Sequence, residues 1–186
     1  MAGRRPFESL YVHVPFCHGK CDYCAFYSLG SYGRAEQEAY IRRMLNEMTE
    51  RSNNCAILRS VFFGGGTPTA LDDDLFERLL DGVRSHFHFS EDTEWTIEAN
   101  PESLSEKKIA IMASHGVTRV SMGIQSFEPR IRTVLGRCGH LEGLEAKVDM
   151  LRKAGICHVN FDFIYNVPSQ TPDDFRMDLQ KADSIS

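Results

Sequence analysis

The sequence has no apolar run long enough to cross a membrane. A transmembrane helix needs roughly 20 consecutive apolar residues, and no such run occurs in the 186 residues. The first ten residues, MAGRRPFESL, contain two arginines but no apolar segment after them, so they do not resemble a secretory signal. We therefore expect a cytoplasmic protein whose thiols are kept reduced.

The chain also lacks an excess of basic residues. It has 21 Lys and Arg against 26 Asp and Glu, a formal net charge of -5, and no stretch rich in both basic and aromatic residues. We therefore expect no nucleic-acid partner. There is no internal repeat or low-complexity segment, and the composition of 42% hydrophobic and 25% charged residues fits one globular domain.

Cysteine is scarce, and its distribution is uneven. Only six cysteines are present, and three of them fall within eight residues, at Cys17, Cys21 and Cys24. In a reducing compartment such residues are metal ligands or small buried side chains more often than disulfides. The other three are scattered, carry no motif and are interpreted as ordinary reduced cysteines: Cys55, Cys138 and Cys157.

Short apolar runs alternate with segments of helical periodicity along the whole chain. The pattern predicts strands at 9–14, 59–63, 93–99, 118–124 and 157–165, and helices at 35–51, 71–87, 105–115, 141–154 and from 171 onward. Such alternation predicts an α/β fold with a parallel sheet and right-handed crossovers, either a barrel or a doubly wound sheet. The chain ends where a sixth strand could begin, so we expect a partial (β/α) barrel, truncated near the start of that strand.

The three clustered cysteines have the spacing C-x3-C-x2-C and directly follow the first predicted strand. Their polar, glycine-containing surroundings indicate a loop, which argues against core packing. A structural zinc site needs a fourth ligand, and His13 and His18 are near enough in sequence to keep zinc as an alternative. An iron–sulfur cube held by three thiolates has one iron without a protein ligand, and that iron can bind a substrate or cofactor.

Polar residues follow the other predicted strands, where parallel α/β barrels place their chemistry. The run Gly64 to Gly66 lets the backbone approach a polar ligand closely, and the Gly-Lys-Ser/Thr ending of a phosphate loop is missing. Arg137 lies between glycines and could bind a carboxylate. Three further candidates stand at the end of a strand or among apolar strand residues, where a polar group needs a partner: Glu98, Gln125 and Asp162.

With Tyr23 just before its last cysteine, the C-x3-C-x2-C motif resembles the signature of the radical S-adenosylmethionine (SAM) superfamily. The resemblance implies a partial barrel of six β/α units and a 4Fe-4S cluster on Cys17, Cys21 and Cys24. It also implies that the amine and carboxylate of SAM occupy the open iron, and that an electron donor reduces the cluster.

A longer set of segments resembles one branch of that superfamily. From about residue 9 to the end, the chain is similar to the oxygen-independent coproporphyrinogen III oxidase and heme chaperone family, in LYVHVPFCHGKCDYCAFYS, FFGGGTPT, IEANPESL, GVTRVSMGIQSF, LGRCGH and VNFDFIYNVPSQT. Residues 1–186 would then be an incomplete radical SAM core domain without the family's C-terminal domain. The resemblance implies SAM contacts at Tyr11, Tyr23, Gly65, Gly66, Thr67, Glu98, Gln125, Arg137 and Asp162.

Phe26 separates the two members of this family. The decarboxylating oxidase has a fourth cysteine two residues after the third, where this chain has Phe26, and the heme chaperones have C-x-F-Y there. We therefore hypothesise a heme chaperone that binds heme and hands it to an acceptor protein of unknown identity. Two alternatives stay open: an anaerobic coproporphyrinogen III oxidative decarboxylase of porphyrin biosynthesis, which would take the porphyrinogen as substrate, and another radical SAM enzyme.

No axial heme ligand is assigned from the sequence. The candidates are His13, His18, His140, His158 and Cys138. In the last matching segment, Asn166 and Ser169 stand where glycines are common in the family, so we expect this loop to differ in stability rather than in function.

Overall fold

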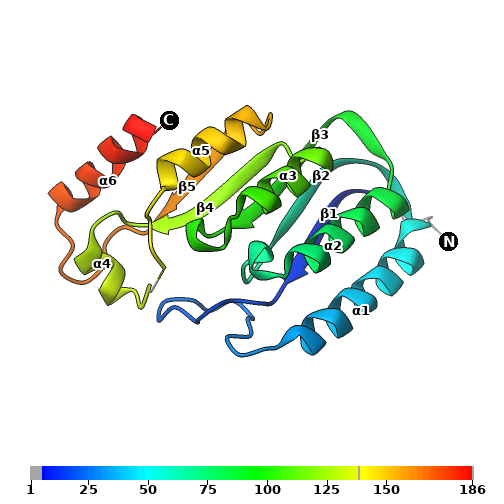
Figure 1. The fold of residues 1–186 in the computed structure, drawn as a ribbon, viewed down its shortest axis with the longest axis horizontal. Helices are drawn as coiled ribbons and strands as arrows, with labels where there is room; N and C mark the ends of the chain where they lie inside the picture. The colour runs from blue at the N-terminus through cyan, green and yellow to red at the C-terminus, as the bar shows by residue number, and fades with distance from the viewer. Residues whose placement is uncertain (1–5, 138, 186) are drawn as a thin grey trace.

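The computed structural model describes residues 6–137 and 139–185 and contains a five-stranded parallel sheet. Each strand lies beside the strand that precedes it in sequence (Figure 1), which is the order of a β/α barrel, whereas a doubly wound sheet reverses direction at a switch point. The partial barrel predicted from the sequence is thus confirmed. The strands are β1 (Phe7–Val14), β2 (Cys55–Gly65), β3 (Phe89–Ala99), β4 (Arg119–Gln125) and β5 (His158–Phe163).

In the described part of the chain, six α-helices connect or follow these strands. Five match the predicted helices: α1 (Arg34–Ser52), α2 (Asp73–His86), α3 (Glu106–Ser114), α5 (Leu144–Lys153) and α6 (Pro172–Ile185). The sixth, α4 (Pro129–Val134), was not predicted, because six residues are too few to show helical periodicity. Short 3-10 helices also follow β2 and β3, at Pro68–Ala70 and Pro101–Ser103.

One face of the sheet is covered by helices and forms the core. Alternate residues of each central strand are buried there, and Trp95 of β3 stacks between Phe63 and Phe89, with ring centroids 5.8 and 5.6 Å away. The α2 residues that pack against this face recur at helical spacing. They are Leu75, Leu79, Leu80 and Val83.

The opposite side of the sheet, which we call the open face, carries the intervening residues, because side chains alternate along a strand. It is mainly polar and includes two aromatic side chains. From β1 to β5 its residues are Ser9, Tyr11, His13, Ser60, Phe62, Gly64, Glu94, Thr96, Glu98, Arg119, Ser121, Gly123, His158, Asn160 and Asp162.

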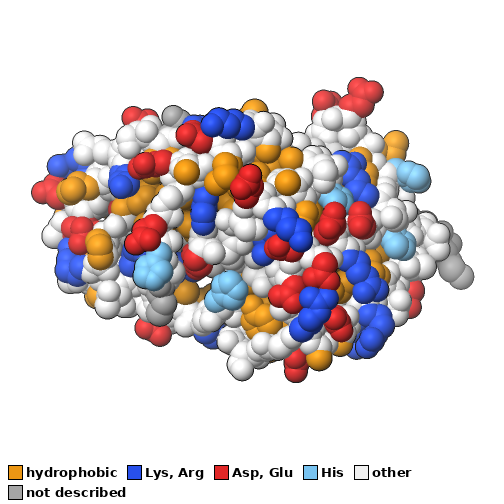
Figure 2. Space-filling model, viewed as in Figure 1, with side chains coloured by type: hydrophobic (Ala, Val, Ile, Leu, Met, Phe, Trp, Pro, Cys, Tyr) orange, Lys and Arg blue, Asp and Glu red, His pale blue; other side chains and the backbone are white. Residues whose placement is uncertain are grey.

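The carboxyl ends of the strands meet at one end of the molecule. The loop 15–33 and helix α4 lie at this end, whereas the start of β1 lies at the other (Figure 1). On the helix-covered side, acidic and basic side chains are interspersed (Figure 2). None of the helices in the described part of the chain is long and apolar enough to span a bilayer.

The loop between β5 and α6 contains two residues in the left-handed backbone region, Asn166 at φ 62° and Ser169 at φ 65°. Arg130 of α4 holds this loop, since its guanidinium donates to the carbonyl oxygen of Ser169 at 2.7 Å and to Asp174 at 2.8 Å. Asp174 also accepts the amide of Thr171, which starts α6 as predicted.

Replacing Ser169 with glycine should stabilise the chain. A residue with a Cβ in the left-handed region destabilises the folded state by about 1–2 kcal/mol. Glycine removes this cost, but it destabilises the folded state by about 0.5–1 kcal/mol because its unfolded chain has more conformational entropy. We expect Ser169→Gly to raise the free energy of unfolding by roughly 0.5–1 kcal/mol, measured by urea denaturation. Ser169→Ala, which keeps the Cβ and loses only the hydroxyl, is the control and should not stabilise. An equal gain from both variants would show that backbone strain is not the cause.

Candidate functional site

A cavity of about 300 Å³ opens at the carboxyl ends of the strands. Its wall is formed by the loop after β1 and by residues at or just beyond the carboxyl ends of β2, β3, β4 and β5. Of the twelve site residues predicted from the sequence, eleven line it: Cys17, Cys21, Tyr23, Cys24, Gly65, Gly66, Thr67, Glu98, Gln125, Arg137 and Asp162.

The cysteine loop is tied to the sheet by backbone hydrogen bonds. Leu29 donates to the carbonyl of Pro15 at 2.6 Å, and Cys17 donates back to Leu29 at 3.0 Å, which closes the loop at its base. The amide of Asp22 donates to the carbonyl of Leu135 at 3.2 Å, which joins the loop to α4. The backbone therefore places all three cysteines on the cavity wall.

The three thiols are free and differ in their surroundings. Cys17 Sγ lies 3.7 Å from the Thr67 hydroxyl, and Arg137 Nη1 donates to Cys21 Sγ at 3.6 Å. Burial raises the pKa of the Cys17 thiol, whereas its hydrogen bond with Thr67 acts the other way. Burial and the neighbouring Cys21 raise the pKa of the Tyr23 phenol to about 12, so this group remains a donor at neutral pH.

Across residues 6–137 and 139–185, no group of three or more Cys, His, Asp or Glu side chains converges as a site for one metal ion. The tetrahedral zinc site kept open from the sequence would need four convergent ligands, so the structure does not support it. A cube in which each thiolate binds a different iron has no such requirement.

The glycine run after β2 serves packing within the protein. A Cβ on Gly66 would lie 2.7 Å from the carbonyl oxygen of Phe16, and one on Gly65, whose φ is 107°, would lie 2.4 Å from the His13 ring. The amides of Gly65, Gly66 and Thr67 donate to Glu98, Val14 and Phe16, respectively. The backbone of this run can therefore offer a ligand only its carbonyl oxygens.

Two carboxylates form the acidic side of the cavity. Glu98 comes from β3 and accepts the Gly65 amide at 3.2 Å, while both carboxylate oxygens of Asp162, on β5, accept the Ser121 hydroxyl at 3.0–3.1 Å. Burial raises the pKa of both carboxyls, and the charge of Asp162 raises the pKa of Glu98 further. The protein surroundings therefore disfavour these negative charges, and a bound cation would relieve that cost.

Arg137 provides the basic side. Its Nη2 donates to Asn100 Oδ1 at 2.5 Å and to the carbonyl of Gly123 at 2.6 Å, and its buried Nε has no hydrogen-bond partner among the described residues. Burial opposes its charge, but Cys21, Glu102 and Tyr23 outweigh that effect and raise the pKa of the guanidinium. The cavity can thus hold a ligand that carries both charges.

Gln125 reaches the cavity through an irregular backbone. Its φ is 68°, and the register between β4 and β5 shifts between Gly123 and Gln125, which marks a bulge. A Cβ on Gly123 would lie 2.9 Å from the Gln125 amide nitrogen and 3.2 Å from Arg137 Nη2. Glycine at 123 therefore leaves the room that these two side chains occupy.

Nine lining residues were not among the predicted site residues, and three of them lie among the polar groups of the site. Asn100 links Arg137 to the Thr67 hydroxyl, to which its amide donates at 3.0 Å. Ser121 and Gly123 lie on the open face of β4, where Ser121 pairs with Asn160 of β5 and Gly123 pairs with Asp162. The sequence could have indicated Ser121 and Gly123, because they precede Gln125 by four and two residues and such spacing puts residues on one face of a strand.

Tyr11 does not line the cavity, although it lies on the same open face. Its hydroxyl is 3.1 Å from His13 Nδ1, and His13 Nε2 lies 3.0 Å from the carbonyl oxygen of Tyr27. Both ring nitrogens of His13 are therefore engaged, whereas His18, His140 and His158 are outside the cavity lining. Cys138 lies outside the described residues.

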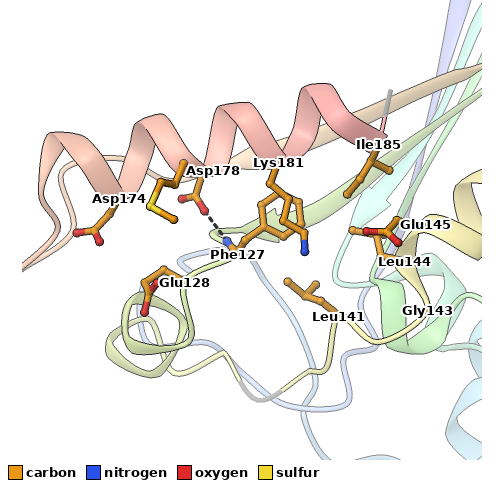
Figure 3. Close-up of a pocket in the computed structure, with 11 residues that line it drawn as sticks. Phe127, Glu128, Leu141, Gly143, Leu144, Glu145, Asp174, Asp178, Lys181 and Ile185 are labelled. Atoms are coloured by element: carbon orange, nitrogen blue, oxygen red, sulfur yellow. Dashed lines mark hydrogen bonds between the residues drawn. The ribbon is translucent and has the colours of Figure 1, made fainter.

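A second cavity, of about 340 Å³, lies beneath α6 (Figure 3). Phe127, Leu141 and Ile185 face it, and Asp178 closes one side by accepting the Phe127 amide at 2.6 Å and the Ser126 hydroxyl at 2.8 Å. None of the twelve predicted site residues lines it.

The fold and the first cavity define a parallel α/β protein with a thiol-rich ligand site at its strand ends. The family model of the radical SAM superfamily matches residues 11–182, and the chain belongs to that superfamily. Membership implies a 4Fe-4S cluster and SAM. The eleven lining residues fit this pair of groups, with three free thiols, a guanidinium and two carboxylates around one cavity.

Curated relatives of both kinds named above are similar to the chain. It is 36% identical over 166 residues to the oxygen-independent coproporphyrinogen III oxidase of Bradyrhizobium diazoefficiens, covering 88% of this chain and 37% of the relative. It is 34% identical over 174 residues to heme chaperone HemW of Lactococcus lactis, covering 94% and 45%. The chain thus spans less than half the length of these relatives, and the identities do not separate the two branches.

Solved structures agree on the fold. The coproporphyrinogen III oxidase HemN of Escherichia coli superposes with a TM-score of 0.88 at 30% identity, over 96% of this chain and 42% of that one. The radical SAM methyltransferase TsrM of Kitasatospora setae superposes with a TM-score of 0.68 over 98% and 35%, and at 16% identity it supports the fold alone.

The raised carboxyl pKa values predict how the empty protein responds to pH. A carboxyl whose pKa is higher in the folded state stabilises the fold below its unfolded pKa, and this stabilisation is lost as pH rises through the folded pKa. Glu98→Gln removes the charge and can still accept the Gly65 amide. We expect it to raise the melting temperature of the ligand-free chain at pH 7, with the gain vanishing below about pH 4.

The measurement is thermal unfolding followed by circular dichroism at several pH values. Glu91→Gln, an exposed substitution on the same strand, is the matched control and should show no such trend. A variant Glu98→Gln that is less stable than the parent chain at pH 7 would contradict the assignment of desolvation as the dominant cause.

Proposed function

We propose that this chain is the radical SAM core of a heme chaperone, a protein that binds heme and transfers it to an acceptor while retaining a cluster and SAM. The observation that carries the proposal is Phe26. It stands where the decarboxylating oxidases have a fourth cysteine, lines the cavity close to Cys24, and is 68% exposed. An exposed phenyl ring there suits contact with a flat apolar ligand and supplies no thiol.

In this proposal Cys17, Cys21 and Cys24 hold the cluster. All three line one cavity, are free, and lie on a loop that backbone hydrogen bonds attach to the sheet. The cluster, once bound and reduced, would supply an electron to SAM. The neighbouring Arg137, which already donates to Cys21, would compensate thiolate charge on this side of the site.

The remaining lining residues are assigned to SAM by charge. Arg137 would bind the carboxylate as a fork, and Glu98 with the carbonyls of Gly65 and Gly66 would accept hydrogen bonds from the ammonium group. Asp162 would accept from the ribose hydroxyls, and Tyr23, Thr67 and Gln125 would complete the wall. Tyr11, which does not line the cavity, stays a predicted SAM contact that this assignment by charge does not use.

The alternative is the anaerobic oxidative decarboxylation of coproporphyrinogen III. The similarity to HemN of Escherichia coli, at a TM-score of 0.88, favours it. The absence of a cysteine at position 26 favours the chaperone instead. A matched pair of assays separates these two functions.

The cluster assignment predicts the result of reconstitution. Incubation with iron and sulfide under anaerobic conditions should give the absorbance and, after reduction, the EPR signal of one 4Fe-4S cluster per chain. Alanine at Cys17, Cys21 or Cys24 should abolish both signals, because each thiolate holds a different iron. Cys157→Ala, which removes an exposed cysteine outside the cavity, is the control and should leave them unchanged. Stoichiometric zinc without iron would refute the assignment.

The chaperone assignment predicts binding without turnover. The reconstituted chain, and any longer form of the protein, should bind hemin with a saturable change in the Soret absorbance. With SAM, reductant and coproporphyrinogen III under anaerobic conditions, it should form no protoporphyrinogen above a sample that lacks the cluster. Sustained protoporphyrinogen formation would instead establish the decarboxylase.

A further inference from the structure

One cross-strand row of the open face combines aromatic and basic side chains. Tyr11 of β1 pairs with Phe62 of β2, Phe62 with Thr96 of β3, and Thr96 with Arg119 of β4. Since neighbouring strands lie about 4.8 Å apart, Phe62 and Arg119 are separated by roughly 10 Å across the sheet. The row thus offers a flat apolar end and a cationic end, with Phe62 and Arg119 two strands apart.

The aromatic end is accessible. Tyr11 is 55% exposed and Phe62 is 37% exposed, and their rings stack with centroids 6.1 Å apart and an interplanar angle of 22°. A stacked exposed pair on a sheet face presents a flat surface on which a planar conjugated ring can lie. The hydroxyl of Tyr11 is turned to His13, which fixes the ring's position.

The cationic end is held by neighbours that a ligand can displace. Arg119 Nη2 donates to Glu94 at 2.9 Å and Nη1 donates to Asn160 at 3.3 Å. A guanidinium has five N–H donors, so these two contacts leave others for a further acceptor. Glu94 is itself exposed, which makes the ion pair weak and easily exchanged for another carboxylate.

The acidic groups of the cavity lie next to this row. Glu98 follows Thr96 by two residues on β3, and Ser121, which binds Asp162, follows Arg119 by two residues on β4. One two-residue step is about 6.6 Å along a strand. Near this row the cavity presents Glu98 and Asp162, so a carboxylate of a ligand on the row is repelled by these two groups and attracted to Arg119.

We propose that Arg119 is a specificity-determining residue that binds a carboxylate of a flat tetrapyrrole whose ring lies on Tyr11 and Phe62. Glu94 holds the guanidinium in place when no ligand is bound, and the incoming carboxylate replaces it. This inference rests on the tetrapyrrole-binding function proposed above and adds the subsite that recognises the acid side chains of the ring.

The test compares hemin with its dimethyl ester, which has the same ring but no free carboxylate. Binding to the reconstituted chain is followed by quenching of Trp95, the only tryptophan in the sequence. Arg119→Gln should weaken hemin binding about tenfold and leave ester binding unchanged. Glu94→Gln should strengthen hemin binding, because it removes the competing carboxylate. Arg43→Gln, an exposed arginine on α1, is the control and should change neither affinity.

The outcomes separate the subsite from the broader function. Equal weakening of hemin and ester by Arg119→Gln, or no effect on either, would overturn the subsite while leaving tetrapyrrole binding intact. Failure of the parent chain to bind hemin at all would overturn the proposed function and the subsite with it. If Arg119→Gln does not fold, as judged by circular dichroism, Arg119→Lys keeps the charge without the fork. It should still weaken hemin more than the ester.

Discussion

The site depends on the way the parallel pairing of β1 and β2 continues beyond the ends of both strands. Gly66 donates to Val14 at 2.7 Å and Thr67 donates to Phe16 at 2.7 Å, and this brings the start of the cysteine loop directly against the glycine run. A Cβ at position 66 would collide with that backbone. Because of this close approach, Cys17 reaches the Thr67 hydroxyl, Thr67 reaches Asn100, and Asn100 reaches Arg137. The cysteine loop and the cavity wall are therefore linked by a continuous chain of hydrogen bonds, and a displacement of the loop would also displace Thr67 and Arg137.

Acidic and basic side chains lie close together, but in separate positions, on and beside the open face. Arg137 donates to the Cys21 thiol, and Glu98 and Asp162 line the cavity from β3 and β5. Arg119 lies outside the cavity lining, two residues before Ser121 on β4. Burial raises the pKa of both carboxyls, and the charge of Asp162 raises the pKa of Glu98 further. SAM, which carries positive charge as well as a carboxylate, would thus bind in the cavity. A flat ligand with acid side chains would bind beside it, at Arg119. This separation allows two different ligands to share one side of a small sheet.

Most of the fold followed from periodicity, because alternating apolar strands and amphipathic helices leave few arrangements besides a parallel sheet. All five strands and five of six helices were predicted, and eleven of twelve candidate residues line one cavity. What the sequence did not show has physical causes. Helix α4 is too short to show a period, and only the contacts of Asn100 with Thr67 and Arg137 show its role. Tyr11 stays a predicted SAM contact, and strand alternation and register place it beside Phe62, outside the cavity lining.

The sequence by itself determined the class of protein, since the spacing of three cysteines and the residues after each strand depend only on local order. It also determined the identity of residue 26, on which the choice between the two proposed functions depends. Tertiary structure decided what these residues do to one another. The amides of the glycine run are used within the protein, the side chains of Gln125 and Arg137 both pack against Gly123, and Arg119 shares a row with two aromatic rings. Those relations arise between residues that are far apart in the chain, and only the register of the sheet brings them together.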